Sequence, residues 1–208
     1  YQRFSKTDFT LQAVMLDLGL TRANTTEMEA HAKKIGVPLE VQRTDIGEVV
    51  FNIRKESHPC ALCSKLRRGA LNNAAVKFNC NKVALGHNRE DVIETFFLSM
   101  LYESKINTFG PVTYLSRRDV TLIRPFVFLS EKYIQGVVAA REIPLLPPNC
   151  PVAGHTKREE MKQLIAHLCT LVPDAEIKII NAIADTKKYG LWDRMRLPPY
   201  MDESINQK

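Results

Sequence analysis

Long apolar runs are absent from this sequence. No stretch of about 18 or more apolar residues occurs, so no segment is predicted to cross a membrane as a helix. The opening residues, YQRFSKTDFT, lack the apolar stretch of a secretory signal peptide. Internal repeats and low-complexity segments are also absent. We therefore expect a cytoplasmic protein with no membrane partner.

Cysteine is uncommon, and its count is odd. Five cysteines occur among 208 residues. An odd count in a cytoplasmic chain argues against a disulfide framework and favours metal or catalytic use of some thiols. The five are Cys60, Cys63, Cys80, Cys150 and Cys169.

The composition is that of an ordinary globular protein, and the net charge is positive. Hydrophobic residues make up 45% and charged residues 25%, and the net charge is +6. The length suits one α/β domain, or a domain with an appendage. The charge fits a polyanionic partner such as RNA, but by itself it indicates only that such encounters are favoured.

Strand-like and helix-like segments alternate along the chain. Strands are predicted over 9–16, 37–45, 82–86 and 121–126, and helices over 24–36, 61–79, 89–102, 131–142, 157–171 and about 174–185. This alternation predicts βαβ units, and thus an α/β fold with a parallel twisted sheet and flanking helices. Ligands bind at the carboxyl ends of such strands, where LDLGL and GHNREDVIET lie.

The segment GHNREDVIET supports two interpretations. In the structural one, Asn88 caps a helix, and Glu90, Asp91 and Glu94 complement its positive end. In the functional one, His87 and Asp91 share a helix face at a strand end, and they face a nucleotide or its magnesium ion.

The cysteine pair in HPCALCSKLRRG supports three interpretations: a structural zinc site, a redox pair and an iron–sulfur cluster. A CxxC at a helix start, beside Arg67 and Arg68, is expected to have a lowered thiol pKa. A structural zinc would need Cys150 and His58 or His155 as further ligands. A redox pair would lack its usual aromatic and proline context. An iron–sulfur cubane would need a third cysteine, which Cys150 suits because it lies in an irregular, proline-rich loop.

The other cysteines and the basic residues have plainer explanations. Cys80 and Cys169 are predicted to be small buried hydrophobes. Lys65, Arg67 and Arg68 can be a solvated helix face, although Arg67 follows Cys63 by four residues and so projects over the same helix end. Basic and aromatic residues interleave over 185–200, which suits phosphates and exposed bases. Packing of that tail on its own domain is an equal alternative.

Four segments occur in one order: CALCSKLRRGAL, KVALGHNREDVIETFFLSMLY, LIRPFVFLSEKYI and IPLLPPNCP. Together they resemble the tRNA 2-thiocytidine synthetase family, the PP-loop, iron–sulfur group of tRNA thiolation enzymes. The likeness runs from about residue 9 to residue 170. Its pairing of CxxCxxLRRG with GHxxxDxxET is specific. Thiouridine synthetases of the two-zinc-finger type carry extra CxxC pairs, which five cysteines cannot supply.

The resemblance implies a fold, cofactors and residue roles. The fold is that of the PP-loop ATPases, related to the adenine nucleotide α-hydrolases. Cys60, Cys63 and Cys150 would bind a [4Fe-4S] cluster, and ATP with Mg²⁺ would adenylate C2 of a pyrimidine. Arg67 would be a basic catalytic residue and Asp91 a catalytic acid. The nucleotide would meet residues at two strand ends and on the basic helix: Leu16, Asp17, Leu18, Arg68, Gly86, His87 and Asn88.

One departure from the family concerns the phosphate loop. Members begin with a strand and an SGGxDS loop whose backbone N–H groups wrap the ATP phosphates. This sequence has no SGGxDS. We expect the loop to lie in about 40 to 60 residues upstream of residue 1, the alternative being a degenerate member. As written, the 208 residues are expected to hold a cluster but to bind ATP poorly.

The sequence thus predicts an ATP-dependent tRNA sulfurtransferase acting on cytidine in the anticodon loop. Residues 1–172 would form the catalytic domain without its phosphate loop, and 173–208 a C-terminal helix and basic tail. Expected partners are tRNA, a sulfur donor (a cysteine desulfurase or inorganic sulfide) and, as a homodimer, a second copy of the chain. The alternatives are a tRNA 2-thiouridine synthetase and a non-catalytic, zinc-stabilised tRNA-binding module.

Overall fold

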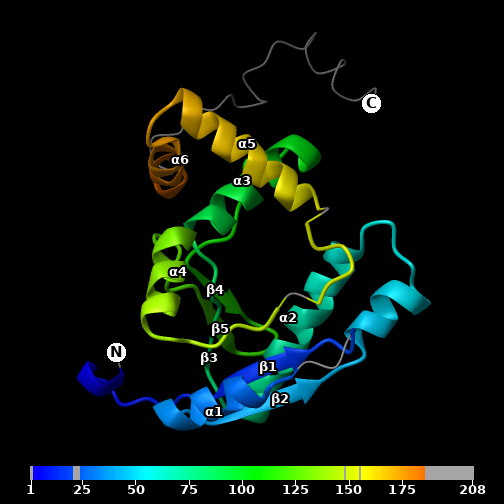
Figure 1. The fold of residues 1–208 in the computed structure, drawn as a ribbon, viewed down its shortest axis with the longest axis vertical. Coiled ribbons are helices and arrows are strands. Elements are labelled where there is room, and N and C mark those ends of the chain that lie inside the picture. Colours follow the sequence, from blue (N-terminus) through cyan, green and yellow to red (C-terminus); the bar gives the residue numbers. More distant parts are fainter. Residues whose placement is uncertain (1, 21–23, 148, 155, 186–208) are drawn as a thin grey trace.

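The computed structural model describes residues 2–20, 24–147, 149–154 and 156–185 (Figure 1). Its elements in chain order are η1 (Gln2–Phe4), β1 (Ala13–Asp17), α1 (Thr26–Ile35), β2 (Leu39–Arg43), the π-helical segment η2 (Glu48–Ile53), α2 (Pro59–Lys77), β3 (Lys82–Ala84), α3 (Arg89–Glu103), β4 (Val112–Leu115), β5 (Val120–Ile123), α4 (Glu131–Ala140), α5 (Lys157–Leu171) and α6 (Ala175–Ala184). None of the described helices is both long and apolar enough to cross a membrane.

The strands form two sheets. Strand β1 runs parallel to β2, with Ala13 opposite Leu39, and helix α1 makes the crossover between them. In the second sheet, β5 lies between β3, which is parallel to it, and β4, which is antiparallel. The parallel pairs and flanking helices confirm the predicted α/β class, while the β4–β5 hairpin was not predicted.

Helix α2 connects the two sheets, because it packs against β1 as well as β3 and β5. It begins at Pro59, where a missing N–H costs nothing because the first N–H groups of a helix have no internal partner. Its Ala74 and Ala75 are buried. The helix that carries Cys60 and Cys63 is therefore held in place by both sheets.

Helices α3, α5 and α6 pack against one another at one end of the molecule, with β1, β2 and α1 at the other (Figure 1). Their core contains Val92, Val127 and Ile180, against which Phe109 and Ile183 pack. Helix α6, predicted as part of a C-terminal appendage, thus packs on α3 and α5. The division at residue 172 stays a prediction, and residues 186–208, including the basic and aromatic tail, lie outside the described residues.

One ion pair ties α5 to α3. The Arg158 Nη1 atom lies 2.7 Å from Glu94 Oε2, and the Glu94 side chain is only 1% exposed. Burial raises the pKa of Glu94, and the hydrogen bond from Arg158 opposes that rise. Burying a carboxylate is energetically costly unless the carboxylate is paired. The ion pair with Arg158 therefore offsets the cost of burying Glu94 in the core.

We expect Arg158→Ala to lower the free energy of unfolding by about 2 to 3 kcal/mol, because it leaves Glu94 buried and unpaired. This figure lies below the about 3 to 5 kcal/mol that breaking a fully buried pair costs, since the Arg158 side chain is 42% exposed. Urea unfolding would measure it. The neighbouring Lys157→Ala is the control: its pair with Glu160 lies in solvent, so the loss should stay below about 0.5 kcal/mol. Equal losses in both variants would contradict the assignment.

Candidate active site

The CxxC pair lies in the first turns of α2, with Cys60 exposed and Cys63 half-buried. Cys150 lies half-buried in the loop between α4 and α5. Burial is the main cause that raises the pKa of Cys63, and negative charge on Cys150 and on Cys60 raises it further. The chain thus brings Cys150 close enough to act electrostatically on Cys63, although nearly ninety residues separate the two.

The predicted lowering of the thiol pKa is wrong for Cys63. Arg67 does lower this pKa, as expected, but burial outweighs it. The helix-start pattern was visible in the sequence, whereas burial depends on what packs over the turn. Cys80 and Cys169, predicted to be buried, are only half-buried.

A closed metal site is not formed within the described part of the chain, where no group of three or more His, Cys, Asp and Glu side chains is arranged to hold a metal ion. His58, one of the two histidines considered for zinc, occupies the N-cap position of α2. The other, His155, lies outside the described residues. The metal-ligand role of the cysteines therefore stays a prediction.

The loop after β3 leads into α3 through a capping box. The Asn88 side chain accepts a hydrogen bond from the Asp91 N–H at 3.0 Å, and Asp91 Oδ2 accepts one from the Asn88 N–H at 3.0 Å. Arg158 Nη1 lies 3.2 Å from the other oxygen, Asp91 Oδ1. The predicted cap by Asn88 is thereby confirmed, and Asp91 takes part in it while also pairing with Arg158, whereas Glu94 lies beyond the first turn of α3, buried against Arg158.

His87, one residue before the cap, has an imidazole pKa lowered from its ordinary value. Burial lowers its pKa most, and the positive charges of Arg124, Arg158 and Arg67 lower it further against the opposing effect of Asp91. Its ring lies 4.8 Å from that of Phe109, and its buried Nδ1 has no hydrogen-bond partner among the described residues. Arg67 acts on both Cys63 and His87, so the cysteine end of α2 and the end of β3 both lie within electrostatic range of this arginine.

The carboxyl end of β1 is held by hydrogen bonds to the segment that follows β2. The carbonyl of Asp17 accepts hydrogen bonds from the N–H and hydroxyl of Thr44, both at 2.9 Å, and Leu18 accepts one from the Gly47 N–H. Gly19 follows with a φ of 72°, and a Cβ there would lie 2.8 Å from the Thr44 carbonyl oxygen. Only glycine suits this turn. Among the described residues, no hydrogen bond or ion pair joins Leu16, Asp17 or Leu18 to the His87 loop.

Arg124 is a site residue that the sequence interpretation missed. It directly follows β5, is 8% exposed, and lies with its guanidinium carbon 4.7 Å from the centre of the Phe109 ring. Its Nη1 donates hydrogen bonds to Gly110 O at 2.7 Å and Thr113 Oγ1 at 3.1 Å. The available signal was a lone cation at the end of the apolar strand segment TLIRPF, next to the parallel strand that leads to His87.

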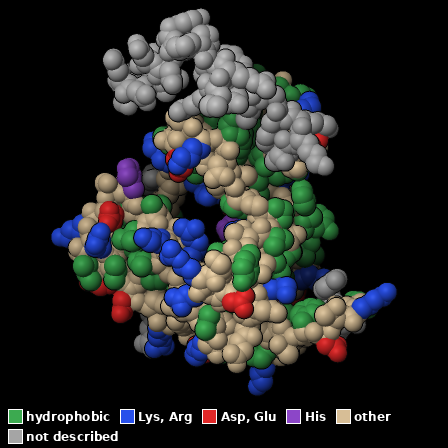
Figure 2. Space-filling model, turned by 180° about the vertical axis from the view of Figure 1, so that it is seen from behind, with side chains coloured by type: hydrophobic (Ala, Val, Ile, Leu, Met, Phe, Trp, Pro, Cys, Tyr) green, Lys and Arg blue, Asp and Glu red, His purple; other side chains and the backbone are tan. Residues whose placement is uncertain are grey.

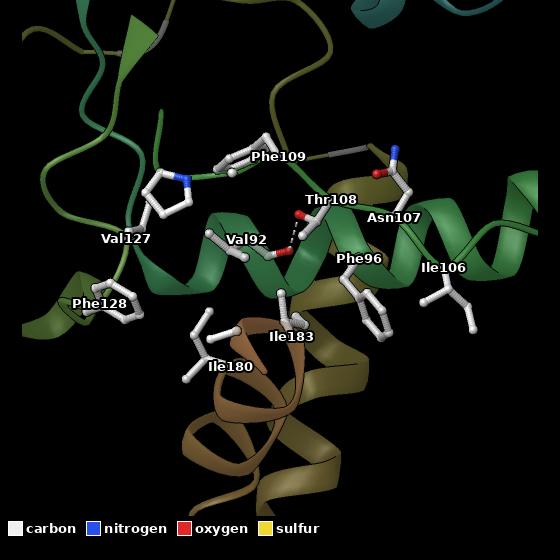
Figure 3. Close-up of a pocket in the computed structure, with 13 residues that line it drawn as sticks. Val92, Phe96, Ile106, Asn107, Thr108, Phe109, Val127, Phe128, Ile180 and Ile183 are labelled. Carbon is white, nitrogen blue, oxygen red and sulfur yellow. Dashed lines mark hydrogen bonds between the residues drawn. The ribbon is translucent and has the colours of Figure 1, made fainter. Parts of the chain in front are cut away.

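A separate apolar cavity of about 440 Å³ lies between α3, α6 and the loop before β4 (Figure 3). The hydroxyl of Thr108 in its wall donates to the Val92 carbonyl at 3.0 Å. None of the predicted site residues lines it; the lining residues are Val92, Phe96, Ile106, Asn107, Thr108, Phe109, Gly110, Pro111, Val127, Phe128, Ile180, Ile183 and Ala184. The candidate active site is thus the region around His87 and the cysteines.

The sequence matches one protein-family model and several curated relatives. The PP-loop domain family matches residues 2–146. Among curated relatives, a tRNA-cytidine(32) 2-sulfurtransferase of Syntrophotalea carbinolica is 31% identical over 89% of this chain and 73% of its own length. One from Anaeromyxobacter sp. (strain K) is 33% identical over 90% of this chain and 65% of its own. The chain therefore belongs to the PP-loop family of tRNA 2-thiolation enzymes, as its motifs indicated.

The fold is also shared with a solved structure. The U34-tRNA thiolase NcsA from Methanococcus maripaludis, determined with its [4Fe-4S] cluster, matches with a TM-score of 0.68. The match covers 88% of this chain and 64% of that one, at 19% sequence identity. At this identity the likeness establishes the fold.

We expect the depressed pKa of His87 to make the fold less stable in acid. Its pKa lies below the ordinary value of about 6.5, so the unfolded chain takes up the proton first as the pH falls. Stability contributed by the neutral ring is complete above pH 6.5 and is lost as the pH drops through the folded-state value. Denaturant unfolding between pH 7.5 and 5 should therefore show a smaller acid loss in His87→Gln. His167→Gln, on an exposed position of α5, should keep the wild-type slope.

Proposed function

We propose that this protein is an ATP-dependent tRNA sulfurtransferase that replaces the C2 oxygen of a cytidine with sulfur. ATP would adenylate that oxygen and release pyrophosphate. A sulfur nucleophile then forms the C–S bond while the C–O bond breaks, and the oxygen leaves with AMP. The observation that carries the proposal is that Arg67 acts electrostatically on both Cys63 and His87, and Cys60 and Cys150 on Cys63, in a chain of the tRNA thiolation family.

The three cysteines suit a [4Fe-4S] cluster by their chemistry. The charges of Cys60 and Cys150, from two separate segments, both act on Cys63, and the positive charge of Arg67 acts on it in the opposite sense. Cys60, Cys63 and Cys150 would hold three corners of the cluster, and when bound it would supply an iron atom that holds the transferable sulfur. Thiolates are the ligands that such clusters require, whereas magnesium prefers oxygen.

The roles of the other residues follow from their charge and position. Arg67, whose charge acts on both Cys63 and His87, would stabilise negative charge that develops as the oxygen leaves. Asp91 is the proposed acid, and its ion pair with Arg158 fixes the carboxylate at the start of α3. Neutral His87 would donate or accept a hydrogen bond at its unpartnered Nδ1.

The nucleotide is proposed to lie across the strand ends, with Mg²⁺ at its phosphates. The β1 end would meet the base through the backbone of Leu16, Asp17 and Leu18. Gly86, His87 and Asn88 would meet the nucleotide after β3, and exposed Arg68 on α2 would contact phosphate. Carboxyl ends of parallel strands are the usual ligand edge of such sheets.

Partners follow from the reaction. The substrate is tRNA, consistent with the net charge of +6. The sulfur would come from a cysteine desulfurase or from inorganic sulfide, and the protein would act in the cytoplasm, where tRNA is modified. A homodimer is the proposed assembly.

Metal analysis tests the cysteine assignment. Protein purified without oxygen should contain about four irons and four sulfides per chain, with little zinc. Cys60→Ala, Cys63→Ala and Cys150→Ala should each lose the cluster, because each removes a corner ligand. Cys169→Ala is the matched control and should retain iron and sulfide at the wild-type level. One zinc without sulfide would instead support a structural, zinc-stabilised module.

The reaction is tested on tRNA from cells with and without the gene. We expect 2-thiocytidine to disappear from the nucleosides of the deletion strain and to return with the wild-type gene but not with Cys150→Ala. The Cys169→Ala gene should restore it. Loss of a 2-thiouridine instead would establish the uridine alternative, and an unchanged nucleoside profile would refute a thiolation role.

A further inference from the structure

Arg124 carries a buried positive charge that the surrounding protein does not neutralise. Its side chain is 8% exposed, and no carboxylate of the described residues lies within ion-pair distance of it. All its hydrogen-bond acceptors are neutral: the Gly110 carbonyl and the Thr113 hydroxyl hold its Nη1. Buried charges are costly and are normally paired, so an unpaired one indicates a charge that arrives with a ligand.

Two of the guanidinium nitrogens, Nε and Nη2, have no hydrogen-bond partner among the described residues. Nε is fully buried and has no partner. Nη2 makes no hydrogen bond with the described residues and is not among the fully buried, unpartnered nitrogens, so solvent or a ligand reaches it. The bonds to Nη1 and the Phe109 ring beneath the guanidinium fix its orientation. The group is therefore held in one orientation, with Nη2 as the donor that a ligand can reach.

The surroundings of Arg124 are also positive. Burial lowers its pKa most, and the charge of Arg68 lowers it further, which places Arg68 near it. Arg67 and Arg158 act together with Arg124 on His87. The neighbouring acid, Asp91, is already paired with Arg158. Figure 2 shows Lys and Arg side chains gathered at the edge of the central hollow of the molecule.

We propose that Arg124, together with Arg68, forms an anion site that binds a phosphate group. Arg124 lies at the carboxyl end of β5, beside the β3 end that leads to His87, where the reacting groups are proposed to meet. A phosphate oxygen would accept charge-assisted hydrogen bonds from Nη2 of Arg124 and from Arg68. The phosphate belongs either to the nucleotide or to the tRNA backbone. The choice between these two sources of phosphate rests on the proposed function. The anion site itself is inferred from the unpaired, buried charge of Arg124.

Binding of two probes to the full chain tests the site. Inorganic pyrophosphate represents the nucleotide source and is titrated by calorimetry; an unmodified tRNA transcript represents the backbone source and is measured by fluorescence anisotropy at fixed salt. Arg124→Gln and Arg68→Gln should each weaken one probe or both by at least about tenfold, equivalent to about 1.4 kcal/mol. Arg118→Gln, an exposed arginine in the turn of the same β4–β5 hairpin, should stay within about twofold of wild type.

The two probes separate the sources. A loss confined to pyrophosphate assigns the site to the nucleotide, and a loss confined to tRNA assigns it to the RNA backbone. Affinities of both arginine variants within about twofold of wild type overturn the proposal, as does a wild-type chain that binds neither probe. Equal losses in Arg118→Gln overturn it too, because they would reflect overall charge alone.

A second measurement covers the case in which Arg124→Gln does not fold. Arg68 is exposed, so its substitution leaves the core intact. The bound probe should raise the melting temperature of the wild type and of Arg118→Gln, but not that of Arg68→Gln. An equal rise in all three would overturn the proposal. None of these readouts requires sulfur transfer, so failure of the thiolation test and failure of this one are distinguishable.

Discussion

The ion pair between Arg158 and the buried Glu94 is the contact on which the candidate site depends most. Glu94 belongs to α3, whose first residues carry the His87 loop, and Arg158 belongs to the first turn of α5, just after the loop that holds Cys150. The same guanidinium nitrogen also reaches Asp91. A single cation thereby sets the distance between a cysteine loop and a proposed catalytic carboxylate, and its loss would affect both.

Several groups serve structure and chemistry at once. Asp91 caps α3, pairs with Arg158 and is also the proposed acid. Asn88 caps the same helix, forms a bridge with Phe126 and precedes Arg89, whose N–H bonds to the Leu129 carbonyl. These links fasten the loop after β3 to the loop after β5. His87 and Arg124, which follow those two strands, are consequently kept in fixed relation.

Local signals in the sequence predicted the helices well. Helix α5 occupies the predicted 157–171, with Thr156 as its cap, and α1 ends at Gly36 in the left-handed conformation. Strand β4 was not predicted because its four residues are partly or fully exposed. They form a strand only through their pairing with β5. The high pKa of Cys63 and the burial of Arg124 were missed for a related reason. Both depend on segments distant in sequence, such as Phe109 over Arg124.

The contacts that assemble the site also determine when it can form. Glu90 accepts a hydrogen bond from the backbone N–H of Glu131, 41 residues away, and Arg158 is 67 residues from Asp91. Each contact closes a long loop, whose entropy must be lost before the contact stabilises anything. The β1–α1–β2 unit, by contrast, closes over a short crossover. We therefore expect that unit to form before the groups around His87 are fixed in place.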